Sequence, residues 1–158
     1  MKKIGISLGI MILFALSIKA QTPELNNKIV NYVDSQIGKK VDRGECWDLA
    51  YEALTQNNCS WDGKYVFGKK LNQKSDIIYP GDIIQFTNVN IKYTRNGMLY
   101  KEAYKHHTAI IHKVIGPGHY EIAHQNNGFS GKKVGLSDLD LSNKTGGTIE
   151  IYRPQPKK

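Results

Sequence analysis

The sequence Gly44-Glu45-Cys46-Trp47-Asp48-Leu49-Ala50 places a cysteine at the start of a helical apolar pattern. The apolar residues that follow recur at i, i+3, i+4 and i+7, which is typical of one face of a helix. They are Trp47, Ala50, Tyr51 and Leu54. Cys46 is therefore expected in the first turn of this helix, where positive dipole charge and unpaired backbone N–H groups favour a thiolate. We predict that Cys46 is a nucleophile and that the same N–H groups can bind an oxyanion.

Cys59 is the only other cysteine, and two cysteines in an exported chain first suggest a disulfide. The two would lie at opposite ends of the predicted helix, which would be ~18 Å long. Bridged Cα atoms lie within about 7 Å of each other. We therefore expect no bridge between them. Cys59 is expected to be a buried or partly exposed free thiol, with pairing to another molecule as the alternative.

All five histidines lie between residues 106 and 124. A thiol hydrolase needs an imidazole base and a polar group that orients its ring. In the predicted strand at 107–112, side chains alternate between the two faces. His107 therefore points away from His106 and His112. We predict that His107 is the general base, because it can face the strand that returns beside it.

The orienting role is open between two residues of that returning strand, His124 and Asn126. They share one face of the predicted strand at 120–126, and a turn at Gly116-Pro117-Gly118 would bring this strand beside His107. Either side chain can hydrogen-bond to an imidazole. We expect no metal and no cofactor, because the ligand spacing of a zinc site is missing from these histidines.

The whole chain predicts an α+β domain, with two helices ahead of about five antiparallel strands. The first helix is expected to extend to residue 37, with Thr22 as its N-cap and Pro23 in its first position. Short strands are expected at 83–86, 90–94, from 98, 107–114, 120–126 and 148–152. Among their connections, Asn96-Gly97 is the strongest hairpin signal.

Residues 1–20 are typical of a cleaved secretion signal. Lys2 and Lys3 precede an almost uncharged apolar run, and Ala20 is the small residue that a signal peptidase prefers. The run is shorter than the roughly 20 residues that span a bilayer, and an uncleaved anchor is the alternative. We therefore expect one domain at residues 21–158, secreted or periplasmic, without stable membrane insertion.

The chain is basic, with 22 Lys and Arg against 14 Asp and Glu and a formal net charge of +8. Aromatic residues are not interleaved with the basic ones along a groove-like pattern, so nucleic acid is not an expected partner. A mildly basic surface suits an anionic polymer such as a bacterial wall, although a solvated lysine surface is the more frequent explanation. We expect a monomer that acts on a peptide or on peptidoglycan.

Four segments, taken in order, resemble the successive motifs of the CHAP and NlpC/P60 peptidases, which have a papain-like fold. They are residues 44–50 (GECWDLA), 80–86 (PGDIIQF), 107–111 (HTAII) and 123–126 (AHQN). The resemblance implies Cys46 as nucleophile, His107 as general base and a polar residue after the next turn as the orienting group. Such enzymes cut peptide or amide bonds in peptidoglycan, and we expect the same activity here.

The third position departs from part of this pattern. CHAP domains usually carry a glutamate, followed two residues later by an asparagine, where this chain has His124 and Asn126. NlpC/P60 enzymes often use histidine there. Residues 44–50, 106–111 and 151–154 also resemble a cysteine-proteinase-fold domain of fungal myosin-tail-interacting proteins. That likeness, together with His124 in the third position, favours one alternative, a catalytically silent binding module. A further alternative is a protease or acyltransferase of the same fold that acts on another protein.

Overall fold

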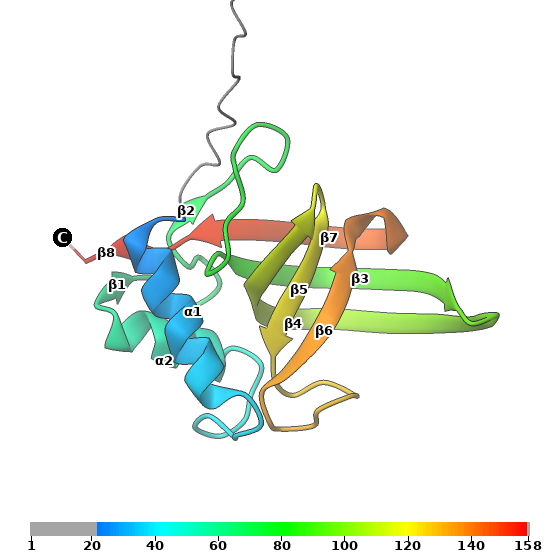
Figure 1. The fold of residues 1–158 in the computed structure, drawn as a ribbon, viewed down its shortest axis with the longest axis horizontal. Coiled ribbons are helices and arrows are strands. Elements are labelled where there is room, and N and C mark those ends of the chain that lie inside the picture. The colour runs from blue at the N-terminus through cyan, green and yellow to red at the C-terminus, as the bar shows by residue number, and fades with distance from the viewer. Residues whose placement is uncertain (1–21, 158) are drawn as a thin grey trace, which may run out of the picture.

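Two helices and a six-stranded antiparallel sheet make up the computed structural model, which describes residues 22–157 (Figure 1). The helices are α1 (Glu24–Gln36) and α2 (Asp48–Gln56). In sheet order, the strands are β2 (Lys69–Lys70), β7 (Lys144–Arg153), β3 (Ile83–Arg95), β4 (Met98–Gly116), β5 (His119–His124) and β6 (Gly135–Asp140). A separate pair joins β1 (Cys59–Ser60) to β8 (Gln155–Pro156), and Leu141–Asn143 form a 3-10 helix. The predicted α+β fold is confirmed, whereas the expected signal segment lies outside the described residues.

Helix α1 follows the apolar spacing that predicted it. Ile29 and Val33, one turn apart, are both fully buried. Its N-cap is Pro23 and not the expected Thr22. Proline is tolerated here because an N–H at the start of a helix would have no intrahelical acceptor. Within residues 22–157, neither helix has the length and apolar character needed to cross a membrane.

Each face of the central strands has its own apolar core, because side chains alternate along a strand. Ile83 and Ile110 belong to the core that includes residues of α1 and α2. Their strand neighbours Ile84, Ala109 and Ile111 belong to a second core. The centre of the sheet is therefore buried on both sides, and a polar side chain on either face needs a hydrogen-bonding partner.

The predicted hairpin at Asn96-Gly97 is confirmed. Both residues have positive φ, 51° and 76°, as a two-residue turn with twist-matched strands requires. Arg95 pairs with Met98 directly across the turn. The hairpin is much longer than the sequence predicted, and Figure 1 shows its tip projecting from the side of the molecule opposite the helices.

Strand β6 is missing from the prediction because its sequence has no strand-like period. Leu136 and Leu139 are its only large apolar residues, and a spacing of three does not alternate. The strand forms because β5 offers it a partner along its full length, from His119 opposite Asp140 to His124 opposite Gly135. Its pairing is thus a tertiary effect.

Candidate active site

Cys46 lies in a tight turn just before α2, and not inside the first turn of the helix as predicted. The N–H of Asp48 donates to the carbonyl oxygen of Glu45 over 3.1 Å. The N–H of Tyr51 donates to the carbonyl oxygen of Trp47 over 2.9 Å. The carboxylate of Asp48, the first residue of α2, accepts from the N–H of Glu45 over 2.9 Å. Cys46 therefore still lies where the helix leaves backbone N–H groups unpaired.

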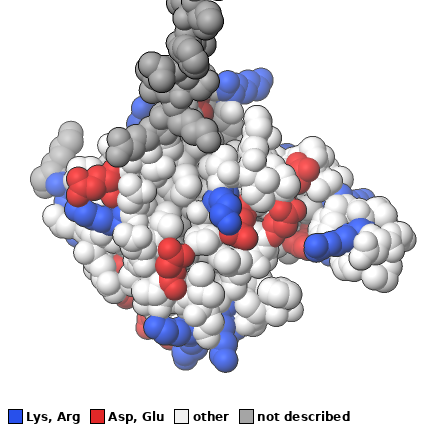
Figure 2. Space-filling view, viewed as in Figure 1, with Lys and Arg blue, Asp and Glu red and all other residues white. Residues whose placement is uncertain are grey.

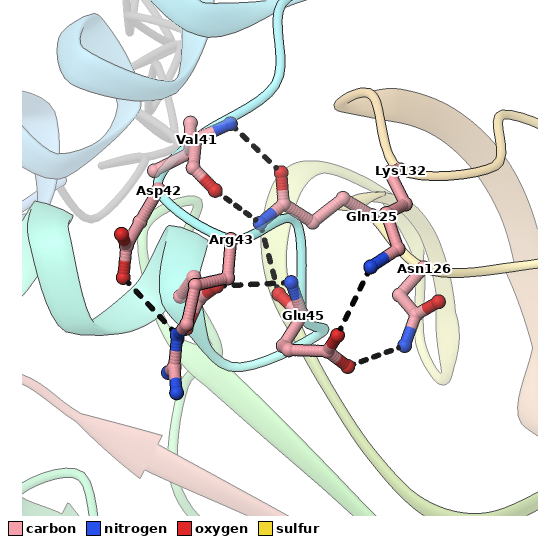
Figure 3. A network of polar contacts seen from close by, with 8 residues as sticks. Val41, Asp42, Arg43, Glu45, Gln125, Asn126 and Lys132 are labelled. Carbon is pink, nitrogen blue, oxygen red and sulfur yellow. Dashed lines mark hydrogen bonds and ion pairs between the residues drawn. The ribbon is translucent and has the colours of Figure 1, made fainter.

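Gln125 ties this turn to the chain just after β5 (Figure 3). Its fully buried amide accepts from the N–H of Val41 over 3.2 Å and donates to the carbonyl oxygens of Val41 and Glu45 over 3.0 and 2.8 Å. Gln125 has no role in the sequence-based prediction, although it lies between the two candidates His124 and Asn126. The sequence signal that could have identified it is a glutamine directly after an apolar strand, because a buried amide needs hydrogen-bond partners.

The sulfur of Cys46 is half-buried beside β4, the strand that carries His107. Sγ lies 4.0 Å from the carbonyl oxygen of His106. Burial raises the pKa of the Cys46 thiol and the Glu45 carboxylate raises it further, while the N–H groups of Thr108, Cys46 and Trp47 lower it. The net direction is upward. The backbone donors thus favour the thiolate, as the position ahead of the helix predicts, but desolvation outweighs them.

His107 and His124 lie side by side on one face of the sheet, as strand parity predicted. Nε2 of His107 is 2.8 Å from Nδ1 of His124, and the two rings meet edge to face with centroids 5.0 Å apart. Burial lowers the pKa of His107 to about 4. Burial, with the charge of His107 as the second cause, lowers the pKa of His124 to about 3. Both rings are therefore neutral at pH 7.

Cys46 approaches the backbone on both sides of His107. Its sulfur is near the His106 carbonyl oxygen, and the Thr108 N–H acts on it as a donor. Among the described residues there is no hydrogen bond between Cys46 and His107, and only Nε2 of His107 has a partner, His124. The resting site is thus a thiol beside the backbone of a neutral histidine and not a thiolate–imidazolium pair.

Asn126 occupies a different position from His124. Strand β5 ends at His124, and Asn126 has a left-handed backbone with φ of 58°, which takes its side chain out of the strand alternation. Its exposed amide donates to Oε2 of Glu45 over 2.8 Å, and Lys132 approaches the same carboxylate at 3.3 Å (Figure 3). The structure brings His124, and not Asn126, into contact with His107.

The remaining histidines have partners elsewhere. His112 links α1 to β5 through Asp34 at 2.7 Å and Glu121 at 2.8 Å. The other contacts are a ring stack of His106 on Tyr65 and a contact of the His119 ring with the Asp138 carboxylate over 2.6 Å. Within residues 22–157, no group of three or more His, Cys, Asp or Glu side chains is placed to hold a metal. Cys46 and the buried Cys59 are both free, as expected.

A cysteine ahead of a helix, beside an antiparallel sheet that carries a buried histidine pair, defines a papain-like cysteine-proteinase-fold domain. The chain belongs to the family of the AIM3/BBC1 cysteine proteinase-fold domain, whose family model matches residues 17–158. The resemblance to a cysteine-proteinase-fold domain is thereby confirmed.

One curated relative supports this family, and one solved structure supports the fold. Altered inheritance of mitochondria protein 3 from Debaryomyces hansenii is 29% identical over 149 residues, which cover 81% of this chain and 16% of that protein. The chain thus spans about a sixth of the length of that relative. The crystal structure of Ly7917 with the hydrolyzing product of MDP superposes with a TM-score of 0.51 at 19% identity, covering 82% of this chain and 62% of that one. This likeness shows the fold alone.

Proposed function

We propose that this domain is a thiol hydrolase that cleaves amide bonds of peptides or proteins through an acyl-enzyme on Cys46. The observation that carries the proposal is the 2.8 Å contact between Nε2 of His107 and Nδ1 of His124, buried beside the Cys46 turn. Two buried imidazoles with pKa values of about 4 and about 3 oppose folding in acid. Strongly shifted groups of this kind concentrate at functional sites, which supports a base with an orienting partner.

In the proposed reaction, Nδ1 of His107 takes the proton of the Cys46 thiol as the sulfur attacks the carbonyl carbon of the substrate. A C–S bond forms, and the carbonyl electron pair moves to the oxygen, which the N–H groups of Cys46 and Trp47 can stabilise. His107 returns the proton to the leaving amine as the C–N bond breaks. A water molecule then attacks the thioester with His107 again as base, which releases the acid and the Cys46 thiol. His124 holds the His107 ring throughout.

The substrate class is proposed at the level of the amide bond. Peptidoglycan peptides have only weak support, because basic and acidic side chains are interspersed over the face shown in Figure 2 and do not gather into one basic patch there. The Ly7917 structure holds a hydrolyzing product of MDP, but its 19% identity carries no substrate to this chain.

A catalytically silent binding module is the second candidate. It is favoured by the raised pKa of Cys46 and by the lack, among the described residues, of a hydrogen bond between Cys46 and His107. The thiolate is the reactive form of cysteine, so this resting site reacts slowly unless a ligand brings the two side chains together. Such a module would bind peptides near Cys46 without cleaving them.

Alkylation of Cys46 by a thiol-directed probe, followed by mass spectrometry across pH, separates the two candidates. For a hydrolase, His107→Ala slows modification of Cys46. The matched control is the exposed neighbour His106. His106→Ala should leave the rate of Cys46 modification near the wild-type value. Equal Cys46 rates in the wild type and in His107→Ala would contradict the hydrolase proposal.

Cleavage products then identify the substrate class. Wild type, Cys46→Ala and Cys59→Ala are each incubated with purified peptidoglycan and with a library of folded and unfolded proteins. Fragments that form with the wild type and Cys59→Ala, but not with Cys46→Ala, support the hydrolase, and the material that yields them names the class. Peptide binding by all three proteins without Cys46-dependent fragments would establish the binding module instead.

A further inference from the structure

The hydrogen-bonded chain that begins at His107 continues past His124. Oγ of Ser137 lies 2.7 Å from Nε2 of His124, so the His124 ring has a partner on each of its nitrogens. Ser137 lies in β6 opposite Ile122 of β5. Because paired residues of antiparallel strands point to the same face, and Ile122 and His124 share a face, the register places the Ser137 hydroxyl beside His124.

Ser137 also borders a cavity of about 670 Å³ formed between β6 and the β3–β4 hairpin. Tyr93, Arg95, Glu102 and Asp138 are among the other residues that line it. The side chain of Ser137 makes no second hydrogen bond to a described residue. Its oxygen can therefore accept from His124 while its own hydrogen turns toward solvent in this cavity.

The proton positions along this chain depend on one another. A neutral imidazole carries one N–H. For Nδ1 of His107 to accept the Cys46 proton, Nε2 of His107 must carry the hydrogen and donate it to Nδ1 of His124. Nδ1 of His124 is then bare, so the hydrogen of that ring is on Nε2, where it needs an acceptor. The acceptor present in the structure is Oγ of Ser137.

We propose that Ser137 is a positioning residue that sets the tautomers of both His124 and His107. The inference rests on the proposed function of Cys46 and His107, and it deepens that function by naming what keeps the base in its accepting form. Without the hydroxyl, the N–H at Nε2 of the buried His124 would lose its protein acceptor, which is costly. The favoured state would place the hydrogen on Nδ1 of His124. His107 would then accept at Nε2 and carry its hydrogen on Nδ1, where it could no longer take a proton from Cys46.

The tautomers can be read directly from long-range proton–nitrogen NMR spectra of protein labelled with ¹⁵N-histidine at pH 7. In the wild type we expect the hydrogen on Nε2 of both His107 and His124. Ser137→Ala should move it to Nδ1 on both rings, whereas Ser137→Thr, which keeps a hydroxyl, should not. Ser60→Ala, an exposed serine on the separate strand β1, is the control and should match the wild type.

A hydrogen on Nδ1 of either ring in the wild type would overturn the proposal, and so would unchanged tautomers in Ser137→Ala. The wild-type spectrum decides the matter even if the alanine variant fails to fold. The NMR measurement also needs no catalysis. An inert Cys46 with the expected tautomers would therefore count against the proposed function alone. A reactive Cys46 with the other tautomers would count against Ser137 and against Nδ1 of His107 as the accepting nitrogen, but not against the acyl-enzyme on Cys46.

Reaction rates provide the second readout. A wrong tautomer in a Ser-His-Asp triad lowers kcat about 10⁴-fold, so we expect Ser137→Ala to lower the rate of Cys46-dependent cleavage by more than about 10-fold. The pH profile of the remaining activity should also change, because a different nitrogen of His107 then carries the hydrogen. Ser137→Thr should restore the wild-type rate and profile. Wild-type rates in a folded Ser137→Ala variant would overturn the proposal.

Discussion

The side-chain amide of Gln125 donates to the carbonyl oxygen of Glu45 over 2.8 Å, and Glu45 directly precedes Cys46. Through this bond the turn of the candidate nucleophile is joined to the end of the strand that carries His124. The Gln125 side chain is fully buried, and the same amide makes two further bonds to Val41. The distance between sulfur and imidazole therefore depends on Gln125 as well as on the two reacting groups.

Gln125→Ala is expected to destabilise the protein by about 1–3 kcal/mol, because it removes the partner of the buried backbone groups of Val41 and of the part-buried carbonyl oxygen of Glu45. It should also slow the modification of Cys46 by releasing the preceding turn. Urea unfolding and probe kinetics measure the two effects. The control is Gln56→Ala, which removes an exposed glutamine at the end of α2. Similar unfolding midpoints for the two variants would contradict this prediction.

The orienting role can be assigned by comparing His124→Leu with Asn126→Gly. The leucine removes the partner of Nε2 of His107, and we expect a loss of more than about 10-fold in the rate of Cys46 chemistry. Glycine suits the left-handed backbone at position 126, so this change removes only the contact with Glu45 and should have little effect on that rate. A larger loss for Asn126→Gly than for His124→Leu would give the orienting role to Asn126.

The free energy of unfolding is expected to decrease as the pH falls from about 6.5 toward 4. The pKa values of His107 and His124 in the folded protein are about 4 and about 3. In this interval the unfolded chain binds protons that the folded chain excludes, so stability that is present above the unfolded pKa is lost as pH falls through the folded values. Urea unfolding at a series of pH values measures the slope.

The variant His124→Leu should show a shallower dependence of the unfolding free energy on pH over the same interval. It lacks one of the two imidazoles that resist protonation in the folded state. His112 has the opposite sign. Its burial opposes the charge, but hydrogen bonds to Glu121 and Asp34 outweigh burial and raise its pKa, so its contribution is lost as pH rises. Both proteins contain His112, and the difference between their slopes isolates His124. Equal slopes would show that His124 titrates normally in the folded state.

Asp82 is expected to be one of the most sensitive positions for stability. Its carboxylate is fully buried and accepts from Arg153 at 3.0 and 2.8 Å and from the N–H of Tyr79 at 2.9 Å. Asp82→Ala should cost about 3 kcal/mol in the free energy of unfolding, because Arg153 loses its buried partner. Glu24→Gln, which removes an exposed ion pair with Lys28, is the control and should leave unfolding almost unchanged. A similarly small effect of Asp82→Ala would refute the prediction.

Short-range patterns predicted much of the site. The i, i+3, i+4, i+7 spacing after Cys46 corresponds to α2, and Asn96-Gly97 forms the expected turn. Strand parity was enough to place His107 and His124 on one face, because alternation along a strand is a backbone property that does not depend on distant residues. Parity could not separate His124 from Asn126, since it holds only while the strand continues and β5 ends at His124.

The sequence by itself determined which residues can do chemistry and on which face they lie, because helix period, strand alternation and turn chemistry are set by neighbours in the chain. Only the tertiary structure decided how those residues are tuned. Strand β6 and its Ser137 depend on pairing with β5, and Gln125 reaches a loop distant in sequence. The raised pKa of Cys46 also has a tertiary origin. Desolvation sums over all atoms packed around the sulfur, and those atoms come together only in the folded chain.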